Sequence, residues 1–297
     1  MLLTPCTKKT LVTDGKTQSS QMDEFAYHES LVHPPLLRCA MSGKPPKSVF
    51  IGGGGELATA REVLRHKSVE RVVMLDIDGK VIEVCKKFLP EWGGEKVTSD
   101  PRFELIISDA HAWMMETEEK FDVIIMDISD PIEAGPGIML YTKEFYAHAL
   151  TRLNMPGGVF VTQSGTADAV PPSHAGQGSA DTSCYGPINN TLREVFDCVV
   201  PYSVNIPSFG GDWGYTMAFQ APPDRKGENT KVENEWKFAE TEVIDKLIEQ
   251  QIEGGADILK AYDGDAHKGL FALTKALRKM LQNDTRVMTR ANPVFMY

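Results

Sequence analysis

Acidic side chains follow several short apolar runs of this sequence, a pattern typical of a ligand site at one edge of a parallel sheet. Asp127 comes directly after the run FDVIIM and Asp130 follows three residues later, where Pro131 favours an extended or turn conformation at Asp130. Two carboxylates three residues apart on such a loop can face one cleft, and their mutual repulsion favours a cation between them. We therefore expect an anionic site that takes a positively charged ligand.

Two other strand ends also carry acids. Asp76 closes the run RVVML, where a carboxylate can hold ribose hydroxyls, and Asp109 closes FELII, where one can accept a hydrogen bond from an adenine amino group. Asp78 fits the N-cap of a helix, and an N-cap explains Asp109 equally well. Capping accounts for any one of these acids but poorly for the whole set.

A glycine run, Gly52–Gly55, lies between an expected strand and an expected helix and is followed by Glu56. Gly53 and Gly54 would let the backbone approach a cofactor closely. Residues 57–58 replace the third glycine of the dinucleotide fingerprint, and no Gly-Lys-Ser/Thr of a P-loop follows. Because no Lys or Arg occupies these strand ends, the site suits an adenosine without phosphates and a substrate with ammonium groups.

The scaffold for these residues is predicted by short β-rich runs that alternate with helical stretches from residue 48 onward. Such alternation indicates an α/β fold, with a Rossmann-like parallel sheet covered by helices on both faces. Two later runs, 198–204 and 215–220, would add antiparallel strands, as in a methyltransferase-type sheet. The parallel strands are expected at 48–51, 71–75, 103–107, 121–126 and 158–163, and the helices near 57–66, 79–89, 110–118 and 143–152.

The flanking segments are predicted separately. Asp14-Gly15 indicates a β-hairpin over residues 8–20, and Pro34-Pro35 is expected to interrupt a helix at 24–40. We divide the chain into a hairpin region (1–43), a Rossmann-like catalytic domain (44–222), and a linker with a helical tail (223–297). Within these, residues 166–187 are predicted to be a flexible loop, 221–235 a linker, and 243–252 and 269–281 helical.

Composition narrows the function classes. The 297 residues carry a net charge of −10, which disfavours nucleic acid and anionic membranes as partners. No apolar run reaches about 18 residues, so no membrane span is expected, and without a secretory signal we expect a cytoplasmic location. Five cysteines without a C-x-x-C pair make a disulfide framework or a zinc site improbable, and we expect no metal.

Six stretches together resemble the spermidine/spermine synthase family, the aminopropyltransferases, and most closely its thermospermine synthase branch. They span almost the whole chain, and their joint occurrence is highly specific. They are residues 23–37, 53–66, 70–90, 121–146, 205–219 and 262–279.

The resemblance implies roles for individual residues. Asp127 matches the proton acceptor, and Tyr27 would orient the amine. Glu56 matches the acid that contacts the aminopropyl part of the donor, and Asp76 the acid that binds ribose. Asp109-Ala110 and Pro136 match the surroundings of the adenine, and Gly53 and Gly54 the glycine turn beside the donor. His28, Asp130, Phe209 and Trp213 match the polyamine site, although from the residues alone core packing is the better explanation of Trp213.

The sequence departs from the family in three respects. Leu57 replaces a usual glycine, and the 166–187 loop is longer than usual. The chain begins near the second strand pair of the family's N-terminal β-domain, so we expect a truncated hairpin region. That domain commonly forms the dimer contact in the family, and we expect a homodimer.

The implied reaction moves an aminopropyl group from decarboxylated S-adenosylmethionine, a co-substrate and not a permanently bound cofactor, to a polyamine. Spermidine is the expected acceptor, with thermospermine or spermine as product, and putrescine is an alternative. An amine N-methyltransferase using intact S-adenosylmethionine and an inactive polyamine-binding homologue remain as competing hypotheses. Glu56, at the end where the donor's carboxylate would lie, disfavours the methyltransferase.

Overall fold

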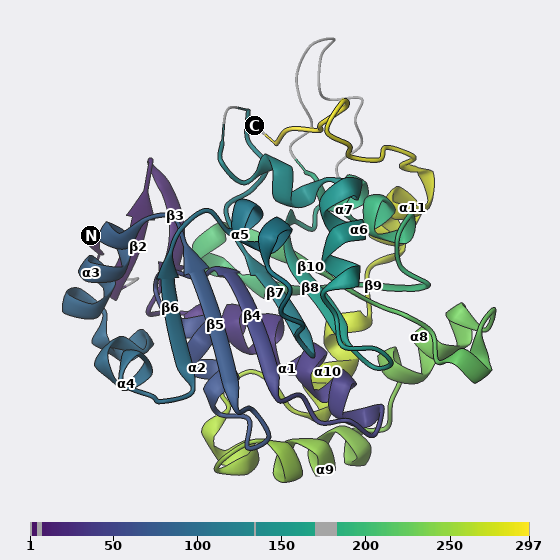
Figure 1. Cartoon of the computed structure of the whole chain (residues 1–297), viewed down its shortest axis with the longest axis horizontal. Coiled ribbons are helices and arrows are strands. Elements are labelled where there is room, and N and C mark those ends of the chain that lie inside the picture. Colours follow the sequence, from purple (N-terminus) through teal and green to yellow (C-terminus); the bar gives the residue numbers. More distant parts are fainter. Residues whose placement is uncertain (1, 5–7, 134, 170–182, 297) are drawn as a thin grey trace.

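The computed structural model describes residues 2–4, 8–133, 135–169 and 183–296, and a seven-stranded sheet forms its centre (Figure 1). The strand order is β6-β5-β4-β7-β8-β10-β9. The first five strands are parallel, and β10 runs antiparallel to both β8 and β9. This confirms the Rossmann-like, methyltransferase-type sheet. The strands are β4 (Ser48–Gly53), β5 (Arg71–Asp76), β6 (Phe103–Ile107), β7 (Val123–Asp127), β8 (Val159–Thr166), β9 (Cys198–Ile206) and β10 (Gly211–Phe219).

Helices cover both faces of the sheet, because its central strands are apolar on both sides. In β4, Val49 and Ile51 pack into one hydrophobic cluster, whereas Phe50 between them packs into another. The first cluster includes side chains of α1 (Glu24–Met41), α2 (Ala58–Leu64), α9 (Thr241–Gln251) and α10 (Gly264–Phe271). The second includes side chains of α5 (Ala110–Glu116), α6 (Lys143–Thr151) and α7 (Tyr185–Arg193).

A small antiparallel sheet precedes these elements and lies near α3 (Gly79–Phe88) in Figure 1. Its strands are β1 (Leu2–Thr4), β2 (Lys8–Thr13) and β3 (Lys16–Ser20). Asp14 and Gly15 join β2 to β3 with φ angles of +51° and +78°. Two successive residues with positive φ form the hairpin turn whose twist matches the flanking strands, so the predicted hairpin is confirmed.

Helix α1 corrects the expectation that Pro34 and Pro35 would interrupt it, because it runs unbroken from Glu24 to Met41. Pro34 lacks the N–H that would bond to the carbonyl of Ser30 four residues earlier. The Tyr202 hydroxyl donates to that carbonyl at 3.0 Å, replacing the missing donor. A partner on a distant strand therefore makes the proline tolerable inside a buried helix.

The C-terminal third is more ordered than predicted. The expected linker 221–235 contains most of α8 (Asn229–Lys237), which is anchored because the buried Glu233 accepts a 2.9 Å hydrogen bond from the Val199 amide. The expected helix 269–281 is two helices, α10 and α11 (Lys275–Asn283), because the Thr274 hydroxyl accepts from the Leu277 amide and caps a new helix.

The expected loop 166–187 ends earlier than predicted, since α7 already begins at Tyr185; residues 170–182 lie outside the described residues. The division at residue 43 stays a prediction, although α1 packs against α2, β7, β8 and β9 of the following region. None of the helices in the described ranges combines the length and apolar character that crossing a membrane requires. Cys39, Cys85 and Cys198 are buried free thiols.

Candidate active site

The glycine run places the backbone of β4 directly against Asp127. Gly53 pairs with Asp127 in the parallel register of β4 and β7, and the Gly54 amide donates to the Asp127 carbonyl at 3.0 Å. Gly53 has φ +83°, and a Cβ on it would lie 2.1 Å from that carbonyl oxygen. Only glycine fits this close approach. The two strand ends that the sequence singled out therefore form one site.

Both carboxylate oxygens of Asp127 accept hydrogen bonds from hydroxyl groups. The Tyr27 hydroxyl on α1 donates to Oδ1 at 2.7 Å, and the Thr59 hydroxyl on α2 donates to Oδ2. Burial and the nearby Glu56 charge raise the Asp127 pKa to about 6, against the lowering effects of His28, Thr59 and Tyr27. A carboxylate with this pKa is ionised at neutral pH and is a stronger base than an ordinary aspartate.

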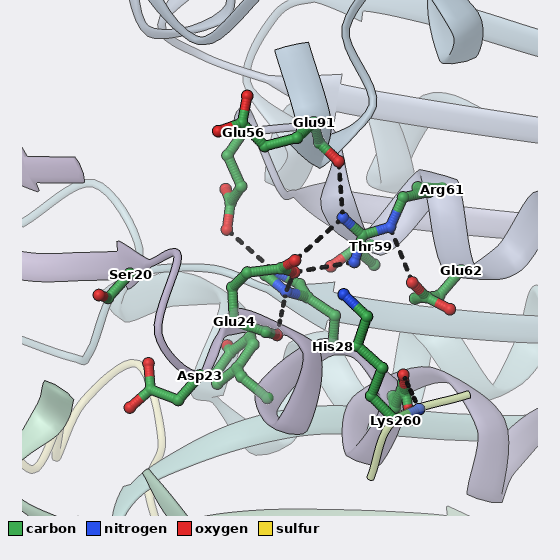
Figure 2. Close-up of polar contacts among 12 residues, drawn as sticks. Ser20, Asp23, Glu24, His28, Glu56, Thr59, Arg61, Glu62, Glu91 and Lys260 are labelled. Atoms are coloured by element: carbon green, nitrogen blue, oxygen red, sulfur yellow. Dashed lines mark hydrogen bonds and ion pairs between the residues drawn. The ribbon is translucent and has the colours of Figure 1, made fainter. Parts of the chain in front are cut away.

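Next to Asp127, a row of alternating charges extends along α1 and α2 (Figure 2). Glu56 accepts from Nε2 of His28 at 3.1 Å, and Glu24 accepts from Nδ1 of the same ring at 3.1 Å. Arg61 forms two hydrogen bonds to the Glu24 carboxylate, of 2.8 and 3.2 Å, and its Nε donates to Glu62 at 2.8 Å. Every member of the row is buried or half-buried, so these are not screened surface pairs.

The predicted donor residues lie along the same sheet edge. Asp76 ends β5, and a Cβ on Gly55 would lie 2.7 Å from its Oδ2, so its carboxylate contacts the glycine turn. Burial raises the pKa of Asp76, although a 2.8 Å hydrogen bond from the Asp78 amide opposes the rise. Asp78 caps α3, accepting from the Lys80 and Val81 amides. The predicted N-cap role of Asp78 is thus confirmed.

Asp109 also acts as a helix N-cap, which was the alternative to a role in adenine binding. Its Oδ1 accepts from the amides of His111 and Ala112 at the start of α5. Its side chain is exposed at the end of β6, and Ala110 is buried beside it. Capping does not exclude ligand contact, because both of these bonds go to Oδ1 and neither goes to Oδ2. Pro136 is exposed in the segment between β7 and α6.

Asp130 belongs to a second polar group, separate from the row around Asp127. Nε2 of Gln163, on β8, donates to Oδ1 of Asp130 at 3.1 Å, to the Ile128 carbonyl at 2.7 Å and to the Tyr141 hydroxyl at 2.8 Å. Burial raises the pKa of Asp130, and Gln163 and Lys16 of the β2–β3 hairpin oppose this. After burial, the Glu56 carboxylate makes the largest contribution that raises the Asp127 pKa. That Asp127 and Asp130 face one cleft stays a prediction.

Three aromatic rings lie in succession, beginning with Tyr27, whose hydroxyl group donates to Asp127. The Tyr27 and Phe209 ring centroids are 5.6 Å apart, and those of Phe209 and Trp213 are 4.7 Å apart, both edge-to-face. Phe209 and Trp213 are half-buried. They form a partly open apolar wall next to acids, an arrangement that fits the methylene segments of a polyamine.

Among the described residues, one cluster of side chains has the geometry to bind a metal ion. His28, Glu56 and Asp127 bring potential ligand atoms within 4.8 Å of one another. Nε2 of His28 is already engaged with Glu56, and Asp127 accepts from two hydroxyls. A metal would need a neutral His28, whereas its two carboxylate neighbours favour the cation. The same pair of carboxylates suits an ammonium group.

Comparison with known proteins agrees with this geometry. The model of the spermine/spermidine synthase domain matches residues 24–226. The chain belongs to the spermine/spermidine synthase family. This aminopropyltransferase is 42% identical to a polyamine aminopropyltransferase of Saccharolobus solfataricus, over 97% of this chain and 84% of that protein. It is 38% identical to thermospermine synthase ACAULIS5 of Arabidopsis thaliana, over 97% and 76% respectively.

Solved structures give the same result for the fold of this aminopropyltransferase. A spermidine synthase in complex with the transition state analogue AdoDATO aligns with a TM-score of 0.73 and 30% identity, over 94% of this chain and 82% of that one. Spermidine synthase from Thermotoga maritima aligns with a TM-score of 0.69 and 28% identity over the same shares.

The structure of the aminopropyltransferase brings together most of the residues that the sequence indicated. Gly53, Gly54 and Glu56 meet Asp127, Tyr27 and His28 at the ends of β4 and β7. Sequence reasoning missed Thr59, Gln163, Glu24 and Arg61. Thr59 and Arg61 lie within one or two helical turns of the glycine run, and Glu24 lies four residues before His28 on the expected helix, a spacing at which helical side chains meet. Gln163 gave no signal that spacing could reveal.

Proposed function

We propose that this aminopropyltransferase moves the aminopropyl group of decarboxylated S-adenosylmethionine to spermidine, releasing methylthioadenosine, with thermospermine or spermine as product. The observation that carries the proposal is the buried Asp127 carboxylate, which has a raised pKa and accepts hydrogen bonds from two hydroxyl groups. A free alkyl amine is an ammonium ion at neutral pH, so the acceptor must lose a proton before it can attack.

In the proposed reaction Asp127 takes that proton. The neutral amine then attacks the propyl carbon beside the sulfonium, a C–N bond forms, and the C–S bond breaks to leave methylthioadenosine. Tyr27 keeps Asp127 in place and can accept a hydrogen bond from the amine. Positioned general bases contribute roughly 100- to 10,000-fold, and aligning the two reactants contributes at least as much.

The donor would lie along the ends of β4, β5 and β6. We propose that Gly53 and Gly54 admit it closely, Glu56 contacts the aminopropyl part, and Asp76 binds the ribose. Asp109, Ala110 and Pro136 would surround the adenine. Support comes from their common sheet edge and from the contact between Gly55 and Asp76. An adenosine without phosphates suits this edge because the acids there would repel a phosphate.

The acceptor would extend along the aromatic wall. We propose that Phe209 and Trp213 contact its methylenes and Asp130 a distal ammonium. Phe209 lacks a hydroxyl, so it provides no polar partner for the far ammonium of a short diamine such as putrescine. A site without a needed polar partner discriminates strongly. This favours spermidine over putrescine.

One assay tests the proposal. The chain is incubated with decarboxylated S-adenosylmethionine and, separately, putrescine, spermidine and spermine, and the products are resolved by chromatography and mass. Spermidine consumption with stoichiometric methylthioadenosine is expected. Transfer of a methyl group from intact S-adenosylmethionine would instead identify a methyltransferase, and tight methylthioadenosine binding without turnover would identify an inactive homologue.

We also propose that the protein is a homodimer. Light scattering at micromolar concentration tests this.

A further inference from the structure

The proposed base has a charged environment that the reaction scheme leaves unexplained. The carboxylates of Glu56 and Asp127 lie beside one another. One oxygen of each and one ring nitrogen of His28 lie within 4.8 Å of one another. Close carboxylates repel, and without a compensating cation one of them takes up a proton. A protonated Asp127 could not accept a proton from the amine. Something must keep both groups charged.

His28 has the geometry of an internal cation. Its side chain is fully buried, and both ring nitrogens contact carboxylates from different elements: Nδ1 contacts Glu24 on α1 and Nε2 contacts Glu56 after β4. Nδ1 also donates to the Glu24 carbonyl at 2.6 Å. Two ring nitrogens that each face an anionic acceptor must both carry hydrogens, which only the protonated ring provides.

The outer end of the arrangement is fixed by Arg61. Its guanidinium binds Glu24 through two nitrogens, and its Nε binds Glu62, which is fully buried. Burial raises the pKa of Glu24, but His28 and Arg61 outweigh it and bring the value to about 2. Glu24 is therefore a permanent anion, and it anchors the far side of His28.

We propose that His28 is an internal cation that fixes Glu56 and allows Glu56 and Asp127 to remain charged side by side. Glu24 and Arg61 are positioning residues that hold the His28 cation in place. The inference rests on the proposed role of Asp127 as base. It gives His28 a different task from the polyamine contact that the sequence predicted, because no ring nitrogen remains for a substrate.

Further charged and titratable groups surround this pair. Tyr27 contacts the His28 ring edge-to-face at 5.0 Å and donates to Asp127, and Tyr215 lies near enough to interact electrostatically with Asp127. Asp76 is a third acid near Glu56. Burial lowers the pKa of His28, but the hydrogen bonds and charges of Glu24 and Glu56 raise it to about 10. The charge of His28 acts directly on Asp127, where it opposes the rise in pKa.

The experiment combines an imidazole titration with pH–rate profiles. In the wild-type protein, nitrogen-15 NMR of the histidine rings is followed from pH 5 to 9, and His28 is assigned by the signals that disappear in His28→Gln. A doubly protonated His28 ring at pH 8 is expected, where an ordinary histidine is neutral. A His28 ring that is neutral at pH 7.5 overturns the inference, even in a protein without measurable turnover.

The rate profiles test the consequence for Asp127. His28→Gln keeps an N–H donor toward Glu56 but removes the positive charge, which should raise the pKa of Asp127. The acidic limb of the pH profile of kcat/KM should therefore move to higher pH by about 1 to 3 units. His28→Phe also releases Glu56, so the KM for the decarboxylated donor should rise in addition. Glu24→Gln should move the limb in the same direction by less. An unchanged limb in His28→Gln contradicts the inference.

His33→Gln is the matched control. His33 lies on the same helix, is equally buried and contacts a buried glutamate, Glu62, at 3.2 Å, but it is not part of the Asp127 cluster. Its variant should lose thermal stability without moving the acidic limb. If His33→Gln moved the limb as far as His28→Gln, the effect would be structural and the inference would fail. If Asp127→Asn retains activity while His28 proves to be protonated, the role of Asp127 as base is wrong, but the positive charge of His28 is not.

Discussion

The hydroxyl of Tyr27 donates a 2.7 Å hydrogen bond to Oδ1 of Asp127, joining the first helix to a strand end 100 residues further along the chain. The bond connects a buried ring, 7% exposed, to the carboxylate proposed as base. It makes the position and the basicity of Asp127 depend on the packing of α1.

Replacing Asp127 by Asn should lower turnover by at least ~100-fold while sparing methylthioadenosine binding, since the amide keeps the shape but cannot take a proton. Turnover and calorimetric affinity are measured on the same preparation. Asp130→Asn serves as control and should change the KM for polyamine more than kcat. Activity of Asp127→Asn within about tenfold of the wild type contradicts the role of general base.

The wild-type rate should fall at acid pH as Asp127 becomes protonated. Burial and Glu56 raise its pKa to about 6. The base form therefore predominates above pH 6, and kcat/KM should drop about tenfold per unit below it. A profile measured from pH 5 to 9 with saturating donor checks this. A profile that stays flat down to pH 5, as expected of an ordinary aspartate with a pKa near 4, would show that the environment does not shift Asp127.

Tyr27→Phe should lower kcat/KM and move the acidic limb to higher pH, because the Tyr27 hydroxyl stabilises the charged form of Asp127. Hydrogen bonds to charged groups contribute about 1.5 to 3 kcal/mol, which corresponds to a loss of roughly 10- to 100-fold. Tyr146→Phe is the control: Tyr146 is fully buried, and its hydroxyl has no hydrogen-bond partner in the part of the chain described. An identical limb in Tyr27→Phe and wild type refutes the coupling.

Glu56→Gln should narrow the preference for decarboxylated over intact S-adenosylmethionine. A carboxylate in this half-buried position repels the carboxylate that only the intact donor carries. Binding of both donors is measured by calorimetry. Asp76→Asn is the comparison, because the ribose it is proposed to hold occurs in both donors, and it should weaken both equally. Equal affinity of the wild type for the two donors would end this explanation.

Phe209→Tyr should raise the putrescine-to-spermidine ratio of kcat/KM by about tenfold or more. The added hydroxyl gives the far ammonium of the shorter substrate a polar partner at the aromatic wall, where Phe209 contacts Tyr27 and Trp213. Competition between the two amines in one tube gives the ratio directly. If the wild type already prefers putrescine, the specificity argument for Phe209 is wrong.

Local patterns were enough to predict the sheet, its strand ends and much of the donor edge. The runs of β4 and β5 are buried on both sides, so their composition alone indicates central parallel strands, and parallel strands bring their carboxyl ends to one edge. Asp78 as a cap and Asp14-Gly15 as a turn depend only on neighbours along the chain. Asp127 was found because it ends such a strand. These features are encoded within a few residues.

Other features depend on partners that are distant in sequence. The helix with Pro34 is tolerated because Tyr202, 172 residues from Ser30, donates to the orphaned carbonyl. Gln163 reaches Asp130 across 33 residues, and His28 reaches Glu56 across 28. A side chain's charge and basicity are set by burial and by the groups within a few ångströms. Spacing along the chain could name Asp127, His28 and Glu56, but only the tertiary structure decided that the histidine binds Glu56 and lies beside the aspartate.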